Sequence, residues 1–331
     1  MQNGWVLRGL VGVAIATLTT SCDMVAALTS GEDPNADLPP CVDNVCTCGD
    51  FRTQADAQLV LDSFWADDYG LDGDGNGVAC ERLPDTAPTL DRATYFSNSP
   101  HLAFGNPSNA AQTNVNNYLI EKDEYALAYS AEKGTLLWAG WQLNFEWLGR
   151  TGRQDDFRPD GSLPKGVYQV TPRDYSGYDR GHMVPSADRT ASRDVNSATF
   201  LMTNIFPQTA ANNRGPWREL ESYCRDLIYQ QGKSLYILGG IYGQRERLAG
   251  DKISVPSRTW KVILVFDQPN PTAADLTERT EIIAVDMPNA RRIDDQWQTY
   301  QTSVDRIELA TGYDLLADVP EEIQAVVEAR R

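Results

Sequence analysis

The chain has 331 residues, enough for one large domain or two smaller ones. Hydrophobic residues make up 41% of it and charged residues 23%, which is typical of a globular protein and excludes a wholly disordered one. The formal net charge of −17 argues against loose, charge-driven binding of nucleic acid or of an anionic membrane. A polyanion would therefore have to be held by local cations.

The first 22 residues (1–22) predict an export signal. Arg8 is their one Lys or Arg, and the apolar run at 10–18 is too short to span a membrane but suits the hydrophobic region of a signal peptide. The small residues before Cys22 resemble a lipoprotein processing site, although Thr19 stands where such sites usually carry Leu. We expect an exported protein, either a lipoprotein held in the cell envelope by a lipidated Cys22 or a secreted protein cut nearby.

The cysteine pattern predicts disulfides near the N-terminus, because exported proteins reach oxidising compartments. Apart from Cys22, five of the six cysteines remain, and four of these fall within a short stretch. These four are Cys41, Cys46, Cys48 and Cys80. Two bridges among them are expected, with the pairing left open, and Cys224 would then be free.

Composition divides the N-terminal part of the chain into segments. Residues 23–40 and 85–98 read as linkers. Between them, residues 41–84 form a compact acidic unit. Residues 1–84 carry 13 Asp and Glu against 3 Lys and Arg, which accounts for −10 of the net charge of −17. The acidity therefore belongs mainly to the N-terminal quarter of the chain.

The acidic unit contains a candidate cation site. A predicted helix over 55–65 is followed by LDGDGNGVACE, in which Asp72, Asp74 and Asn76 alternate with glycines. This alternation presents oxygen ligands to a hard cation within a tight turn. Glu81 falls at the tenth position of the loop, whereas an EF-hand closes with Glu at the twelfth. The alternative is an acidic turn that is simply solvated.

Residues 46–84 resemble the Excalibur family of small extracellular calcium-binding modules, through the CGDF start, the helix and the DGDGNGVACE end. The resemblance implies a bridge from Cys48, or from Cys46, to Cys80. It also implies calcium at Asp72, Asp74 and Asn76, with Glu81 as a further candidate ligand.

Residues 99–331 show the pattern of a single α+β domain, in which runs of β-branched and aromatic residues predict strands. The expected strands are 125–129, 135–143, 167–171, 235–241, 260–266 and 281–285. The expected helices are 214–229, 297–309 and 321–330. Strands dominate, with helices between and after them.

The stretch YDRGHMVPSADR holds one of the two histidines of the chain. His182 is suited to exchange a proton near neutral pH, and the neighbouring Arg180 is a permanent cation suited to phosphate. The alternative is a turn in which Asp179 pairs with an arginine while His182 is structural. We expect the other histidine, His101, to be structural.

A predicted helix downstream of this stretch carries polar side chains at helical spacing. Asn213, Trp217, Glu221 and Arg225 recur every four residues, so one face would present an amide, a carboxylate and a guanidinium. The alternative is that Asn213 is only the N-cap, with Pro216 in the first turn. An amide oxygen and a carboxylate would suit magnesium, which keeps most of its waters.

The sequence Asp179-Arg180-Gly181-His182 matches the DRGH motif of the DNA/RNA non-specific endonucleases, the ββα-metal nucleases, and the NNRGPWRELESYCR segment resembles the helix of that motif. The flanking segments resemble secreted sugar-non-specific nucleases of filamentous photosynthetic bacteria. The resemblance covers residues 100–325. It implies an α+β fold with a central antiparallel sheet flanked by helices, preceded here by the small disulfide-linked calcium-binding module.

The resemblance also implies roles for individual residues. His182 would be the general base that deprotonates water, Asn213 the direct ligand of a single Mg²⁺ or Mn²⁺, and Glu221 would hold one of that ion's waters. Asp179 would support the same network. The arginines that would stabilise the phosphate are Arg153, Arg180 and Arg225.

The implied activity is Mg²⁺-dependent hydrolysis of single- and double-stranded DNA and RNA to 5′-phosphorylated products. Neither sequence nor sugar should be selected strongly, because these contacts address phosphate rather than base edges. The alternative function is an envelope-anchored scaffold that binds calcium or nucleic acid without catalysis. The sequence leaves open whether a protein inhibitor binds the chain.

Overall fold

The structure is a computed structural model that describes residues 46–48, 51, 54–63, 70–83 and 100–331. The expected signal peptide with Cys22, the linkers and Cys41 lie outside the described residues. Within the described ranges, no helix is long and apolar enough to cross a membrane.

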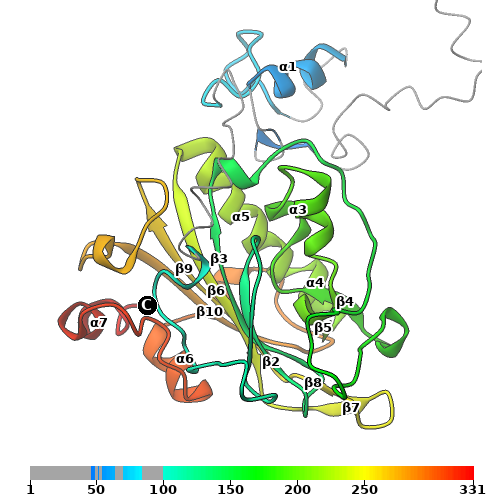
Figure 1. Ribbon diagram of the computed structural model, residues 1–331. Helices are drawn as coiled ribbons and strands as arrows, with labels where there is room; N and C mark the ends of the chain where they lie inside the picture. Colours follow the sequence, from blue (N-terminus) through cyan, green and yellow to red (C-terminus); the bar gives the residue numbers. More distant parts are fainter. Residues whose placement is uncertain (1–45, 49–50, 52–53, 64–69, 84–99) are drawn as a thin grey trace, which may run out of the picture. The chain divides into compact units, whose positions relative to one another are not determined.

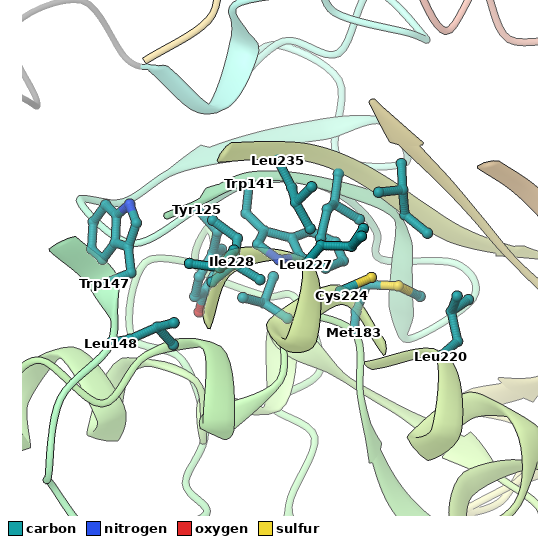
Figure 2. Packing of buried hydrophobic residues seen from close by; sticks show 14 of the residues in the cluster. Tyr125, Trp141, Trp147, Leu148, Met183, Leu220, Cys224, Leu227, Ile228 and Leu235 are labelled. Carbon is teal, nitrogen blue, oxygen red and sulfur yellow. The ribbon is translucent and has the colours of Figure 1, made fainter. Parts of the chain in front are cut away.

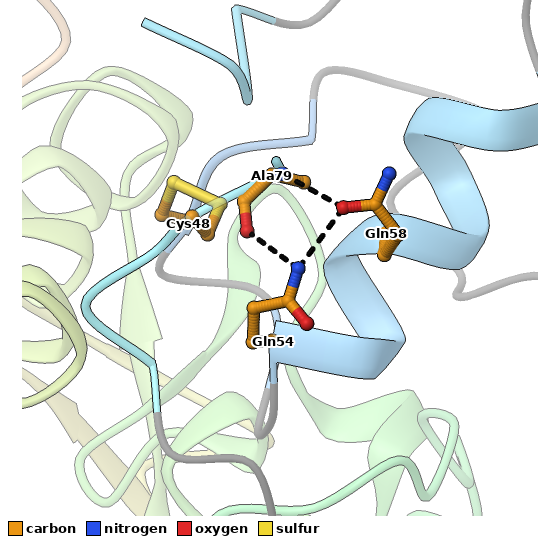
Figure 3. The surroundings of a disulfide bond; sticks show 5 residues. Cys48, Gln54, Gln58 and Ala79 are labelled. Carbon is orange, nitrogen blue, oxygen red and sulfur yellow. Dashed lines mark hydrogen bonds between the residues drawn. A yellow bond between two sulfur atoms is a disulfide. The ribbon is translucent and has the colours of Figure 1, made fainter. Parts of the chain in front are cut away.

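The N-terminal unit includes helix α1 (Gln54–Ser63) and the loop 70–83, and a disulfide joins the segment 46–48, before the helix, to this loop (Figure 3). Cys48 is bonded to Cys80, with 5.5 Å between their Cα atoms. This confirms one of the two pairings that the resemblance implied for Cys80. Cys46 is disulfide-bonded as well.

Two glutamines of α1 hold the helix beside this bridge. Gln54 donates from Nε2 to the Ala79 carbonyl oxygen at 3.3 Å, and Gln58 accepts at Oε1 from the Ala79 N–H at 2.9 Å (Figure 3). Ala57 and Val60, on the same helix, are fully buried. The expected helix is therefore confirmed. Its two glutamines bond to Ala79, which precedes the disulfide-bonded Cys80 in the loop 70–83.

The large domain is built on a seven-stranded sheet in the order β1-β2-β3-β6-β9-β10-β11, in which every neighbouring pair is antiparallel (Figure 1). The strands are β1 (Tyr118–Glu121), β2 (Ala126–Ser130), β3 (Thr135–Leu143), β6 (Ser234–Tyr242), β9 (Arg258–Phe266), β10 (Glu281–Pro288) and β11 (Gln301–Thr302). Five of the six expected strands coincide with β2, β3, β6, β9 and β10. The central antiparallel sheet is thus confirmed.

Helices cover both faces of this sheet, because successive side chains of a strand point to opposite faces. On β9, Ile263 belongs to a buried cluster with α5 (Pro216–Gln231), whereas Val262 belongs to a second cluster with α6 (Val304–Thr311) and α7 (Glu321–Val327). Figure 2 shows the first cluster, in which the apolar side chains of α5 lie against β3 and β6. The sheet is therefore the middle layer of three.

The remaining elements are short. Two two-stranded ribbons pair β4 (Asp179–His182) with β5 (Ile205–Gln208), and β7 (Glu246–Leu248) with β8 (Ile253–Val255). The short α-helices are α3 (Arg193–Ala198) and α4 (Ala210–Arg214). Single 3-10 turns lie at Pro100–Leu102, Phe145–Trp147, Pro172–Asp174, Ser186–Asp188, Met202–Asn204, Ala273–Asp275 and Trp297–Tyr300.

The strand expected over 167–171 is wrong. This segment has no strand partner in the described part of the chain, and it lies between Pro164 and Pro172, neither of which has an N–H for a ladder. Val170 is nevertheless buried, in a small cluster with Tyr175 and other apolar residues. Burial of its apolar side chains explains the strand-like composition of the segment.

Two expected helices have different bounds. The segment 297–309 begins as a 3-10 turn, passes through β11 and becomes helical only after Ser303, whose side chain accepts a hydrogen bond from the Arg306 N–H. Ser303 is thus the N-cap that starts α6. The C-terminal helix ends at Val327 rather than at residue 330.

Candidate active site

The DRGH motif lies on strand β4, not in a turn. It pairs antiparallel with β5, so that Asp179 faces Gln208 and His182 faces Ile205. Glycine is favoured at position 181, because a Cβ there would lie 2.6 Å from the Cβ of Gln208 on the paired strand. The ribbon therefore places Asp179 and His182 at its two ends, on a backbone fixed by ladder hydrogen bonds.

His182 is buried and neutral. Its Nε2 has no hydrogen-bond partner among the described residues, whereas the ring bonds to the Arg180 backbone. Because a carbonyl only accepts, this bond uses Nδ1–H and leaves Nε2 as a bare acceptor. Burial, and after it the charges of Arg153 and Arg180, lower the pKa of His182 to about 3, although the hydrogen bond to the backbone raises it. The ring is thus neutral at pH 7, and Nε2 has a lone pair that no described residue engages.

Two aromatic rings enclose His182, and two arginines lie over these rings. The Phe200 ring meets the imidazole edge-on, with 4.9 Å between ring centroids, and the Phe157 ring lies at 5.4 Å. Arg153 lies over Phe200 at 4.9 Å and Arg180 over Phe157 at 4.2 Å. The cations are therefore held beside the histidine by stacking, where they could contact a phosphate.

Arg153 is further fixed by polar contacts. Its Nη1 donates to Ser186 Oγ at 2.9 Å, and its Nε donates to Asp155 at 2.8 Å. The Asp155 carboxylate is exposed, so a phosphate could displace it at little cost. The loop that carries Arg153 is thus tied to the segment immediately after the DRGH motif.

Asp179 joins the ribbon to helix α4. Asn213 donates from Nδ2 to Asp179 Oδ2 at 2.9 Å, and Arg214 donates from Nε and Nη2 to both carboxylate oxygens, also at 2.9 Å. Burial raises the pKa of Asp179, but the hydrogen bonds from Arg214 and Asn213 outweigh it, so the pKa lies below its usual value. Asp179 is therefore an anion that orients the Asn213 amide.

Asn213 is not the N-cap of the long helix, and the predicted continuous face is wrong at this point. The helical segment breaks at Gly215, with φ −102° and ψ −120°, so that Asn213 lies in α4 and Trp217 in α5. Thr209 is the N-cap of α4. A Cβ at Gly215 would lie 2.5 Å from the Ala211 carbonyl oxygen, so the close approach of the two helices requires glycine.

Glu221 and Arg225, one turn apart on α5, lie in a buried polar cluster. Glu221 pairs with Lys261 of β9 at 3.1 Å, and Arg225 pairs with Asp188 at 3.0 Å. Burial raises the pKa of Glu221; Lys261 opposes this rise and Asp188 adds to it. Asp188 also accepts a hydrogen bond from Trp141 Nε1 at 3.1 Å. Arg225 is therefore engaged by Asp188, which itself follows closely on the DRGH strand.

The Asn213 amide fits the role of a metal ligand. Its Nδ2 is committed to Asp179, and its Oδ1 accepts no hydrogen bond from the described residues. Amide and carboxylate oxygens are ligands that magnesium accepts. A cavity of about 520 Å³ opens on the same helix pair, lined by Arg214 and Arg218 among others. Glu219 and Asp295 also line it, so the cavity presents charges of both signs.

Sequence comparison assigns the domain that carries this geometry. The sequence model of the DNA/RNA non-specific endonucleases matches residues 103–322. The chain belongs to the DNA/RNA non-specific endonuclease family. A nuclease of Nostoc sp. is 47% identical over 257 residues, which are 76% of this chain and 93% of that protein. The mitochondrial nuclease EXOG of Danio rerio is 30% identical over 259 residues, which are 72% of this chain and 71% of that protein.

The fold agrees with this assignment. The chain is similar to a protein in the crystal structure of the EndoG/EndoGI complex, a structure that concerns the mechanism of EndoG inhibition. The TM-score is 0.57 and the sequence identity 20%, and the match covers 71% of this chain and 96% of that one. The mixed α/β nuclease fold is therefore confirmed. The protein is a nuclease, and so a hydrolase.

Sequence reasoning missed three charged residues of this candidate site. Arg214 adjoins the motif helix, but its pairing could not be predicted, because its partner Asp179 is 35 residues away. Lys261 lies within an apolar run that reads only as a strand. Asp188 was visible within the histidine stretch, but its partner Arg225 is 37 residues away. Pairing of this kind leaves no local periodicity.

The second histidine, His101, is engaged within the fold. His101 is buried, and both its ring nitrogens are engaged: Nε2 with the Asp123 carbonyl oxygen at 2.9 Å, and Nδ1 with the Gln142 N–H at 3.3 Å. Burial lowers its pKa to about 3. His101 is thus a neutral structural residue. The remaining cysteine, Cys224, is a free buried thiol, as expected.

In the N-terminal unit the predicted calcium ligands lie on one turn. Asp72 accepts hydrogen bonds from the N–H groups of Gly75, Asn76 and Gly77, and its pKa is lowered chiefly by the Gly77 N–H. The Asn76 amide donates from Nδ2 to Asp74 at 3.1 Å and to Glu81 at 2.7 Å. The loop thus brings its oxygen-bearing side chains together around Asn76.

Proposed function

We propose that the protein is an exported, Mg²⁺-dependent endonuclease that hydrolyses both DNA and RNA to 5′-phosphorylated products. The observation that carries the proposal is the bare Nε2 of neutral His182, buried beside two stacked arginines. A general base needs a free lone pair, and the arginines supply the positive charge that a phosphodiester requires.

His182 acts as the general base in this proposal by accepting a proton from the attacking water at Nε2. With a pKa of about 3 the free imidazole is a weak base. Burial is the main cause of this low pKa, and the charges of Arg153 and Arg180 add to it. A phosphate bound between the two arginines would cancel their charges, so the histidine would gain basicity when substrate is present. Proton uptake is thereby coupled to phosphate binding.

Asn213 would hold the metal ion in this proposal, with its amide oriented by Asp179, which Arg214 holds in place. A bound Mg²⁺ would stabilise the negative charge that develops on the leaving 3′ oxygen. Glu221 would hold one of the ion's waters, and its ion pair with Lys261 keeps the carboxylate in a fixed position. Arg225 supports the network through Asp188 rather than by direct contact with substrate.

The substrate range follows from the kind of contact. The two arginines proposed to contact substrate, Arg153 and Arg180, address phosphate, and phosphate contacts carry no information about base or sugar. We therefore assign DNA and RNA, single- or double-stranded, as substrates. The family description as a DNA/RNA non-specific endonuclease supports this range. The organised Asp179, His182 and Asn213 disfavour a scaffold without catalysis.

Export and calcium binding complete the proposal. Export rests on the first 22 residues and agrees with the disulfide between Cys48 and Cys80. Attachment to a membrane would come from lipidation of Cys22. Calcium would bind at the Asp72 to Glu81 loop. The double substitution Asp72→Asn, Asp74→Asn should then abolish a calcium-dependent rise in the melting temperature of the N-terminal unit, and an unchanged response would contradict calcium binding there.

A metal titration tests the nuclease proposal. The protein is stripped with EDTA and incubated with plasmid DNA and with RNA, alone and with Mg²⁺, Mn²⁺ or Ca²⁺, and the ends of the products are analysed. Degradation of both polymers with Mg²⁺ or Mn²⁺, with 5′-phosphate ends, is expected. Degradation of neither polymer, or 3′-phosphate ends, would contradict the proposal.

A further inference from the structure

Three carboxylates converge where the last two helices meet, outside the nuclease site. Asp305 and Glu308 lie on α6, and Glu328 directly follows α7. One ligand oxygen from each of the three lies within 4.8 Å of the others. The Asp305 N–H donates to the Glu328 carbonyl oxygen at 3.2 Å, so the backbones are held together as well. Figure 1 shows α6 and α7 side by side near the C-terminus.

Nothing in the described part of the chain neutralises this cluster. None of the three carboxylates forms an ion pair there, and Glu308 receives only the Leu315 N–H at Oε1. Glu328 is 6% exposed, and its buried Oε1 has no hydrogen-bond partner. Burial, and after it the negative charges of Glu308, Asp305 and Asp314, raise the pKa of Glu328 to about 7. An unpaired buried carboxylate oxygen is costly, so it points to a missing partner.

We propose that Asp305, Glu308 and Glu328 bind a divalent cation of the calcium type. Calcium takes six to eight oxygen ligands at about 2.3–2.6 Å, so two oxygens on one ion lie up to about 5 Å apart, as these do. The exposed side of Asp305 leaves room for the waters that complete the coordination. Magnesium would fit less well, because it prefers one or two carboxylates and a nearly octahedral shell.

The site is structural and separate from the nuclease centre. The neighbours of its ligands, Val304 and Ile307, belong to the apolar cluster on one face of the sheet, whereas Met183, next to His182, belongs to the cluster on the other face. A cation here would tie the end of α7 to α6. It would therefore stabilise the C-terminal layer without contacting nucleic acid.

Calcium binding to full-length protein tests the proposal, by equilibrium dialysis against CaCl₂ and by thermal unfolding after EDTA treatment. Glu322→Gln is the matched control, because Glu322 is an exposed carboxylate of α7 outside the group. Glu328→Gln should bind one equivalent of calcium fewer than wild type, whereas the control should bind the same number. Calcium at about 100 times its Kd should raise the wild-type melting temperature of this domain by roughly 5–10 °C, and this rise should be lost in Glu328→Gln.

Other results are decisive as well. Without calcium, Glu328→Gln should be as stable as wild type or more stable, because it removes repulsion; this shows that the variant is folded. Equal calcium stoichiometry and an equal melting shift in wild type and Glu328→Gln would overturn the proposal. A melting temperature that changes with pH but not with calcium would overturn it too, since the three carboxylates would then be stabilised by a shared proton rather than by a cation. Any calcium bound at the Asp72 to Glu81 loop is measured separately, as the number of calcium ions that the double variant Asp72→Asn, Asp74→Asn loses relative to wild type.

Discussion

Arg214 donates two parallel hydrogen bonds of 2.9 Å to the carboxylate of Asp179. The same carboxylate accepts a hydrogen bond from the Asn213 amide. A single anion on β4 therefore orients both Asn213 and Arg214, at the end of α4. A paired guanidinium and carboxylate fix geometry more strictly than a single hydrogen bond does. The orientation of the proposed metal ligand thus depends on an arginine that does not itself bind metal.

Arg214→Ala should therefore weaken metal binding more than it weakens folding. We expect the Mg²⁺ concentration for half-maximal cleavage to rise by about tenfold or more. The free energy of unfolding should change by less than about 1 kcal/mol, because the arginine is 70% exposed. Arg218→Ala, whose described partner is the neighbouring Glu219, is the control. An unchanged Mg²⁺ midpoint in Arg214→Ala would contradict the orienting role of this pair.

The pH dependence of cleavage should report the low pKa of His182. The histidine must be neutral to act as a base, and its pKa in the free enzyme is about 3. The acidic limb of kcat/KM, measured at saturating Mg²⁺, should therefore lie well below the ordinary histidine value of about 6.5. The acidic limb of kcat should lie at higher pH, because bound phosphate cancels the charges of Arg153 and Arg180. A kcat/KM limb at pH 6.5 or above would show that the free histidine is not held neutral.

The same shift makes His182 a pH-dependent contributor to stability. Its folded-state pKa lies below its unfolded value, so its contribution is fully present above about pH 6.5 and is lost as the pH falls toward 3. Between pH 7 and pH 4, wild type should lose about 3 kcal/mol more than His182→Gln. Urea unfolding of the two proteins at both pH values measures this difference, in which contributions from other groups cancel. Equal losses would mean that the native histidine titrates normally.

The buried pair of Lys261 and Glu221 should matter for folding as well as for the site. Lys261 is 1% exposed, so Lys261→Met leaves the Glu221 carboxylate buried without its cation and should cost about 3–5 kcal/mol at pH 8. Adding Glu221→Gln should recover part of this loss. Lys233→Met is the matched control: the Asp267 partner of Lys233 is 87% exposed, so its cost should stay below about 1 kcal/mol. A similarly small cost for Lys261→Met would contradict the account of this pair.

Site residues that belong to a short motif could be predicted from the sequence. Those that are placed by a partner far away in the chain could not. His182 is one of two histidines and lies in a specific motif, so it could be found directly. The motif was not expected to be a strand, because Asp179 to His182 shows no alternation of apolar residues. The break at Gly215 was hidden because Asn213 and Pro216 are also normal residues for the start of a helix.

The most direct test of the central claim is single-turnover cleavage of DNA and RNA by His182→Ala at saturating Mg²⁺. Loss of a general base should lower the cleavage rate by about 10²–10⁴-fold on both substrates. The Mg²⁺ midpoint should remain that of wild type, whereas Asn213→Ala should shift it. If His182→Ala cleaves either polymer within about tenfold of the wild-type rate, His182 is not the base.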